Sequence, residues 1–358
     1  MTPFAYQRCY PPLQERAGRS TNRESQVGKK LGAVLVGLGV FLLTLGLLSK
    51  FYAYPRLAVA PANQNSVTLA FAKDATYFSI ADRAEKTGDL LTTVNTVGDV
   101  NASKQISEKL GRPIVVWEQM SYSDAPEFNK SDGHAPLSAS RSRIAFDANT
   151  AEAVQCCGTF VTDGADLDTG TEKRNADVKF QGLLVKFPFN TQKKTYQVWD
   201  TTLREAVPAS YKGTEKIDGV TTYKFQSKVD ETDAGTQVAP ASTFGLPIDG
   251  DVTLDRLYSN TVNFWIEPET GAYVNLESNP LVTLNYQGEK VATVTDASAA
   301  YPERDVKANA KEYGSKATLL KIVRTWLPLV GILLGLALAL GGVVLTLNGR
   351  RRQDEKLA

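Results

Sequence analysis

Residues 326–347, which read WLPLVGILLGLALALGGVVLTL, decide the fold class of this chain. The run holds no charged residue, and as a helix rising about 1.5 Å per residue it spans a hydrocarbon core of roughly 30 Å. Pro328 falls in the first turn, where its missing N–H costs little. The buried helix of a soluble protein is the alternative, but uncharged runs of this length are typical of membrane spans.

A second uncharged run lies near the N-terminus, at residues 31–48, and reads LGAVLVGLGVFLLTLGLL. It is about 27 Å long as a helix. Lys50 and the aromatic residues Phe51, Tyr52 and Tyr54 follow it, and side chains of these types complete a crossing at the membrane interface. We therefore expect two transmembrane helices, one near each end of the chain.

The charges beside the two spans predict the orientation. Lys29 and Lys30 precede the first span and arginines 350–352 follow the second, and cationic flanks stay in the cytoplasm. Three cations before the second span favour the opposite orientation: Lys316, Lys321 and Arg324. Because charges beside a long translocated domain carry less weight, we predict an inner-membrane protein with two cytoplasmic tails, residues 1–30 and 348–358.

A cleaved signal peptide is the alternative interpretation of the first run, since Ala58, Val59 and Ala60 form an A-x-A pattern. That pattern lies about a dozen residues beyond the apolar run, and the polar region before the run is about thirty residues long. Both distances are long for a cleaved signal. The sequence therefore favours an uncleaved anchor.

Residues 49–325 are then expected outside the cytoplasm, as a mainly β domain that is barrel-like or a sandwich. Period-two alternation is clearest at residues 222–229, where Tyr223, Phe225 and Val229 share one face. Further strands are predicted at residues 65–72, 113–118, 143–147, 178–187, 194–199, 262–267, 272–277, 281–286 and 289–295.

Turn signals and one recurring pattern describe the connections. Four Asp-Gly pairs punctuate the domain, and Asp218-Gly219 directly precedes a clear strand. Residues 146–154 and 266–274 resemble each other as strand, acidic turn and strand, which predicts one type of hairpin used twice.

Helical signal between the spans is limited to two segments. Residues 101–110 predict a short helix, and residues 303–325 predict a helix that runs into the second span, although Gly314 weakens it. The first thirty residues, with Pro11-Pro12 and many polar side chains, predict a disordered tail.

The three cysteines fall into two groups. Cys9 lies in the predicted tail, where a reducing cytoplasm keeps it a thiol. Cys156 and Cys157 are adjacent and precede Gly158. Three interpretations stay open for this pair: small buried thiols, a vicinal disulfide, and a metal or redox site.

A search for catalytic and cofactor residues finds little. The single histidine, His134, lies in a polar loop and is most simply a solvated turn residue. The carboxylate pairs Asp163/Asp166 and Glu267/Glu269 remain candidates for acid–base partners, but solvated turns explain them better. Nucleotide, zinc-protease and dinucleotide motifs do not occur. We expect a protein that is not an enzyme and that needs no cofactor or metal.

The net charge and the positions of glycines indicate which kinds of partner the chain could bind. Lys and Arg number 40 against 39 Asp and Glu, so there is no electrostatic case for nucleic acid. Gly331 and Gly335 form a G-x-x-x-G inside the second span, and a weaker G-x-x-x-G at Gly28 and Gly32 borders the first. Small residues let helices approach closely, so the spans are expected to pack on each other or on a partner.

The layout of the chain resembles an actinobacterial envelope family that is often labelled the porin PorA family. The resemblance rests on the basic tail, the early anchor, the β-rich domain with Cys156-Cys157-Gly158 and the late span with its Arg-rich end. It implies a role in building the mycolate-containing envelope, in which trehalose monomycolate moves alongside an RND-type exporter and lipoglycans mature. The label porin fits poorly, because an outer-membrane barrel needs outward apolar faces and no helical anchors.

The leading hypothesis is an envelope protein that binds or passes lipid and works with a membrane transporter. A β-rich domain tethered at both ends stays at the membrane, and folds of this size can enclose an apolar ligand. The side chains that could line such a cavity, with core packing as the alternative, are Val185, Phe187, Phe189, Phe225, Phe264 and Trp265. The other two hypotheses are a structural or scaffolding partner and an enzyme acting on envelope glycolipids.

Overall fold

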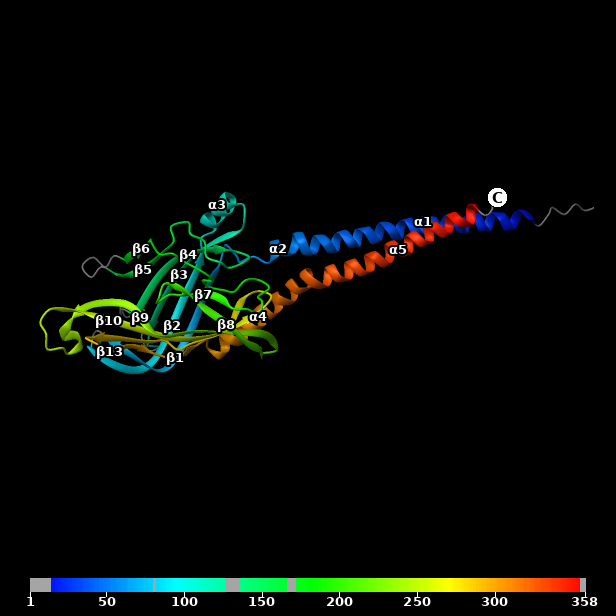
Figure 1. Ribbon diagram of the computed structural model, residues 1–358. Coiled ribbons are helices and arrows are strands. Elements are labelled where there is room, and N and C mark those ends of the chain that lie inside the picture. Colours follow the sequence, from blue (N-terminus) through cyan, green and yellow to red (C-terminus); the bar gives the residue numbers. More distant parts are fainter. Residues whose placement is uncertain (1–13, 80–81, 126–135, 166–171, 355–358) are drawn as a thin grey trace, which may run out of the picture. The chain divides into compact units, whose positions relative to one another are not determined.

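The computed structural model describes residues 14–79, 82–125, 136–165 and 172–354 (Figure 1). The chain divides into a helical unit, residues 1–57 and 321–358, and a β-rich unit, residues 58–320. Cys9, His134 and Asp166 lie outside the described ranges, as does one of the four Asp-Gly pairs, Asp132-Gly133.

The helical unit consists of two long helices. The first is α1 Gln14–Leu48, continued by the π-helical turn η1 Ser49–Ala53 and by α2 Tyr54–Leu57. The second is the π-helical turn η4 Ile322–Trp326 followed by α5 Leu327–Asp354. Both are long and apolar enough to cross a membrane. Their apolar side chains face outward, with Phe41 60% and Leu340 66% exposed, which suits a lipid environment.

The two helices meet through small residues. A Cβ added at Gly39 would lie 2.6 Å from the carbonyl oxygen of Gly335, and one added at Gly335 would lie 2.7 Å from that of Gly39. Gly331 approaches the carbonyl oxygen of Leu42, which would lie 2.9 Å from its Cβ. Close backbone contact of this kind stabilises helix pairs in lipid. On α1 the contacting glycines recur every seventh residue, at Gly32, Gly39 and Gly46.

The first helix is longer than the sequence predicts. It begins at Gln14, so the predicted disorder is wrong for residues 14–30. A helix that is already formed in the apolar span extends without a new nucleation step, and these residues are rich in Gln, Glu, Arg and Lys, which favour helix. Polar composition alone therefore misjudges them.

The helix predicted at residues 303–325 is present and continues into the second span. It is α4 Glu303–Lys321, followed directly by η4 and α5. Gly314, which weakens the prediction, has a packing role: a Cβ there would lie 2.7 Å from Cγ2 of Val220. The missing side chain lets α4 lie against the β8–β9 turn.

The β-rich unit is a single antiparallel sheet. Its hydrogen-bonded order is β6-β5-β4-β3-β2-β1-β13-β12-β10-β9-β8-β7, and β11 and β14 pair outside this path. The strands are β1 Asn65–Ser79, β2 Ala84–Gly98, β3 Ile114–Asp124, β4 Ser138–Asp147, β5 Phe160–Ala165, β6 Glu172–Asn175, β7 Tyr196–Asp200, β8 Glu205–Ile217, β9 Val220–Pro240, β10 Asp251–Glu267, β11 Ala272–Ser278, β12 Leu281–Tyr286, β13 Glu289–Asp296 and β14 Ala299–Ala300. The 3-10 turn η3 Ala241–Phe244 joins β9 to β10.

Irregular backbone links strand β4 to β7, the last strand at one end of this order. Isolated bridges join Phe146 of β4 to Ala153, and Glu152 to Leu183. A third bridge joins Leu183 to Val198 of β7. We call residues 151–154 and 181–184 the seam. The mainly β prediction is confirmed, but one sheet linked through a seam is neither a two-sheet sandwich nor a regularly hydrogen-bonded barrel.

Every predicted strand except residues 178–187 overlaps an observed one. That segment is irregular, with Gly182 at a φ of +65° and only isolated bridges near it. Its apolar side chains are nonetheless buried, as Phe180, Leu183 and Phe187 are at most 4% exposed. Alternating apolar residues report burial, and an irregular segment beside a core produces the same pattern.

Local signals explain α3 and one hairpin. Helix α3 Val100–Leu110 matches the predicted helix, with Asp99 accepting the N–H of Ala102 at 2.9 Å as its N-cap. Asp218 and Gly219 both take positive φ, 48° and 81°, and join β8 to β9 as the predicted hairpin turn.

The acidic turn that the sequence predicts twice is present at both places, beginning at Asp147 and at Glu267. Asp147 and Glu267 each accept N–H bonds from the residues two and three positions later. Each backbone carbonyl also accepts the N–H four residues on, from Ala151 at 2.8 Å and Gly271 at 2.9 Å. Both carboxylates are buried and shape the turn.

Candidate functional site

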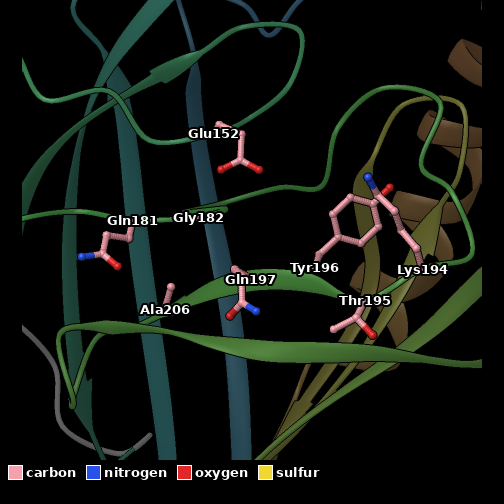
Figure 2. Close-up of a pocket in the computed structure, with 8 residues that line it drawn as sticks. All are labelled: Glu152, Gln181, Gly182, Lys194, Thr195, Tyr196, Gln197 and Ala206. Carbon is pink, nitrogen blue, oxygen red and sulfur yellow. The ribbon is translucent and has the colours of Figure 1, made fainter.

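The candidate site is a shallow pocket of about 350 Å³ at the seam of the β-rich unit (Figure 2). Figure 2 shows that the residues lining the pocket belong to separate segments of the chain. These include the loop with Glu152, the stretch through Gly182, and β7 with the residues before it. The full lining is Glu152, Gln181, Gly182, Lys194, Thr195, Tyr196, Gln197 and Ala206.

The backbone of the seam builds the wall of this pocket. Leu183 donates its N–H to Gln197 at 2.8 Å, and Ala153 donates to Gly182 at 2.9 Å. A Cβ at Gly182 would lie too close to the carbonyl oxygen of Gln197, and its φ of +65° also favours glycine. The residue between the two hydrogen-bonded segments therefore has to be glycine.

Two charged groups of opposite sign line the pocket. Burial raises the pKa of the Glu152 carboxyl, and the positive charge of Lys194 partly offsets this rise. The Lys194 ammonium lies 5.1 Å from the ring centroid of Tyr196. Burial raises the pKa of Tyr196, whose hydroxyl accepts the N–H of Gln192 at 2.8 Å. Tyr196 thus stays a neutral phenol at neutral pH.

The chemistry of the lining is that of hydrogen bonding. The amides of Gln181 and Gln197 offer donors and acceptors together, Glu152 accepts and Lys194 donates. In the pocket as described, no side chain forms a nucleophile–base pair. Among the described residues, no cluster of His, Cys, Asp and Glu could hold a metal ion. Such a pocket suits a small polar ligand.

The residues proposed to line an apolar cavity lie mostly in the core. Phe187 and Phe225 are fully buried, and their ring centroids are 4.7 Å apart. Phe264 is 5.8 Å from Phe187. Trp265 is bonded outside this group of rings, because it donates its indole N–H to the carboxylate of Glu215 at 2.6 Å. Core packing, the alternative interpretation, is correct for these phenylalanines.

Val185 and Phe189 are half-buried, and an unusual lysine lies between them. Lys186 donates through Nζ to the carbonyl oxygen of Phe187 at 2.7 Å, and its ammonium lies 3.9 Å from the ring centroid of Phe189. Burial lowers the pKa of Lys186 to about 7.

The cysteine pair lies in the loop between β4 and β5. A disulfide joins Cys156 to Cys157, and Cys157 takes a φ of 64°. Its carbonyl oxygen accepts a hydrogen bond from Nε of Arg143 at 2.9 Å. The same guanidinium binds Glu118 and Asp99, both at 2.6 Å. The loop is thereby held to strand β3 and to the N-terminus of α3.

Of the carboxylate pairs proposed for acid–base work, Glu267 and Glu269 lie close enough for the charge of Glu269 to add to the rise in the pKa of Glu267, after the larger effect of burial. Asp166 lies outside the described residues. Burial raises the pKa of Glu267, whose carboxylate accepts the Thr270 hydroxyl at 2.6 Å and so stabilises its own turn. The explanation by solvated turns is wrong for Glu267, because this residue is only 3% exposed.

Apart from Gly182, the pocket residues carry no sequence pattern that would predict a binding site. They come from stretches far apart in the chain, and the seam that assembles them has no regular secondary structure. The one local signal is Gly182, inside an apolar alternating stretch, where an isolated glycine indicates close backbone approach.

Comparisons with known proteins agree with one another. A family model described as Porin PorA matches residues 31–344, which includes the first apolar run, the whole β-rich unit and most of the second apolar run. A curated relative from Corynebacterium amycolatum, named Porin PorA, is 24% identical over 299 residues, covering 69% of this chain and 76% of the relative.

Proposed function

This chain belongs to the Porin PorA family, and from that premise we propose that it is a non-enzymatic membrane protein of the cell envelope that binds the sugar headgroup of an envelope glycolipid. The observation that carries the proposal is the seam pocket, where two amides, a carboxylate and an ammonium line about 350 Å³. Sugar hydroxyls both donate and accept, and amides and carboxylates match them.

The two anchors support this role. Residues 58–320 are covalently joined at both ends to apolar helices, so the β-rich unit would stay tethered to the membrane. The cationic flanks favour the inner membrane, with both termini in the cytoplasm and the β-rich unit outside. Envelope glycolipids occur there, and a membrane transporter that moves them is the partner we propose.

The proposal is limited to the headgroup. The phenylalanines that would have lined an acyl-chain cavity fill the interior with ring-to-ring contacts, such as the 4.7 Å between Phe187 and Phe225. Protein interiors packed in this way leave no room for an alkyl chain. The lipid tail therefore stays outside the β-rich unit.

The test is binding of trehalose to the full-length chain in detergent, with maltose as the control sugar, measured by calorimetry. Mass spectrometry of organic extracts from the same preparation would identify co-purified glycolipid. Glu152→Ala should weaken trehalose binding roughly tenfold, because a hydrogen bond to a charged group is worth about 1.5–3 kcal/mol. Gln192→Ala, an exposed change outside the pocket lining, is the matched control. Extracts without glycolipid and no sugar binding would instead favour the scaffolding role.

A second candidate is a channel, as the name of the relative suggests. The described helix pair is apolar on its outside and joined through glycines, so one chain offers no polar path along it. A channel would need several chains. Planar-bilayer recordings test this, because conductance that appears only above a threshold protein concentration indicates assembly, and silence at all concentrations removes the candidate.

A further inference from the structure

The end of the helical unit nearest the β-rich unit in sequence is strongly basic. Residues 49–57 and 321–327 contain no Asp or Glu. They contain four cations, which we call the basic collar: Lys50, Arg56, Lys321 and Arg324.

The two helices contact each other within the segments that carry the collar residues. Ser49 donates its hydroxyl to the carbonyl oxygen of Val323 at 2.7 Å, which ties the first helix to the second at this point. Each helix also changes to a π-helical turn here, at Ser49–Ala53 and at Ile322–Trp326. Such turns are rare and occur frequently at functional sites.

Aromatic rings surround these cations. The Arg56 guanidinium lies 3.7 Å from the ring centroid of Tyr52 and donates to its carbonyl oxygen at 3.1 Å. Lys50 lies 5.7 Å from the centroid of Phe51. Phe51 is 70% and Trp326 53% exposed. Exposed aromatic residues at the end of an apolar helix lie at the level of lipid headgroups.

The collar is not explained by topology. Lys29, Lys30 and arginines 350–352 at the opposite ends of the spans already set the orientation, and cations at the collar work against it. Cations clustered at headgroup level attract phosphate, and Arg binds phosphate with two parallel hydrogen bonds. We infer that the basic collar is a binding site for the phosphate-bearing headgroup of anionic phospholipids.

This site shares no residue with the seam pocket, so the two can fail separately. The test is native mass spectrometry of the full-length chain in detergent, titrated with dioleoyl phosphatidylglycerol or dioleoyl phosphatidylcholine. The wild-type chain should retain phosphatidylglycerol at least tenfold better. Arg56→Gln with Arg324→Gln should remove most of this preference, and Arg56→Lys with Arg324→Lys should keep most of it.

The matched control removes two exposed cations outside the collar, with Lys307→Gln and Lys311→Gln on α4. If this control weakens phosphatidylglycerol binding as much as the collar variant, or if the collar variant changes it less than twofold, the inference is overturned. Inorganic phosphate is added in a separate arm. Displacement of the lipid by millimolar phosphate would overturn a lipid ligand in favour of free phosphate, and retention supports the lipid.

Discussion

At the fifth position of each acidic turn the backbone takes a positive φ, 62° at Ala151 and 69° at Gly271. The two copies of the turn differ in whether this fifth position can carry a side chain. Ala151 carries its Cβ in place, whereas a Cβ at Gly271 would overlap the carbonyl oxygen of Phe187. The same local pattern therefore has different sequence requirements, because the carbonyl oxygen of Phe187 occupies the space that a side chain at position 271 would need.

We expect Gly271→Ala to destabilise the chain by about 2–4 kcal/mol, since the Phe187 backbone must move. Ala151→Gly is the matched change and should stay within about 1 kcal/mol of neutral, because relief of positive φ offsets added flexibility of the unfolded chain. Urea unfolding of both full-length variants in detergent checks this, and equal effects would contradict it.

Because the pKa of Lys186 is lowered in the folded chain, we expect the free energy of unfolding to depend on pH. Its folded-state pKa of about 7 is below its ordinary value of 10.5. Between these values the folded chain binds fewer protons than the unfolded chain, so this residue makes stability rise with pH. Melting temperatures of the wild type minus those of Lys186→Met should rise between pH 7 and 9. Parallel profiles for the two proteins would show that Lys186 is solvated.

Arg143 joins elements that are distant in sequence. From β4 it reaches Glu118 on β3, the N-cap Asp99 of α3, and the Cys157 carbonyl oxygen, so three of its nitrogen atoms are bonded. The hydrogen bond from Ala102 and that from Arg143 lower the pKa of Asp99. The Arg143 side chain is only 16% exposed, which reduces screening by solvent.

Arg143→Ala should therefore destabilise the chain by about 2–3 kcal/mol, because Asp99 and Glu118 each lose an ionic partner, although Glu118 still pairs with Arg141. The comparison is Lys316→Ala, which removes an ion pair with Glu312 in which both side chains are more than half exposed and should cost under about 0.5 kcal/mol. Thermal unfolding measures both. A similar loss for the two variants would mean that the Arg143 network is solvated.

The helix pair offers a comparison within one helix. Gly335 faces α1, whereas a Cβ at Gly341 would meet nothing within 4 Å. Gly335→Leu should separate the helices and lower the melting temperature in detergent, and Gly341→Leu should leave it unchanged. If both leucines are tolerated, the glycine contact does not stabilise the pair.

Helices and strands that are determined by nearby residues could be predicted from the sequence. The two spans follow from their apolar length, α3 from a capped helical stretch, and β9 from alternation around Tyr223 and Phe225. The sequence does not predict strands β2, β5, β6, β8 and β14, because polar and small residues give weak alternation or the strand is short. The pocket could not be predicted, since Glu152, Gly182 and Gln197 meet only through the irregular seam.

For the molecule as a whole, the proposed topology is the premise of the glycolipid hypothesis. In a Cys9→Ser background, Lys224→Cys should react with a membrane-impermeant maleimide in intact cells. Ser25→Cys should react only after permeabilisation, because it precedes the first span on the cytoplasmic side. The reverse labelling pattern would place the β-rich unit in the cytoplasm and exclude the proposed role.

The position of the pocket at the seam has one more consequence. Its walls belong to the seam and to the β7–β8 hairpin, so a bound molecule holds these segments together, and the seam cannot open until that molecule dissociates. By mass action, a ligand at a hundred times its Kd would make this opening about 2.7 kcal/mol harder. Occupancy would then set how often the amide of Leu183, which bonds to Gln197, exchanges its proton with water.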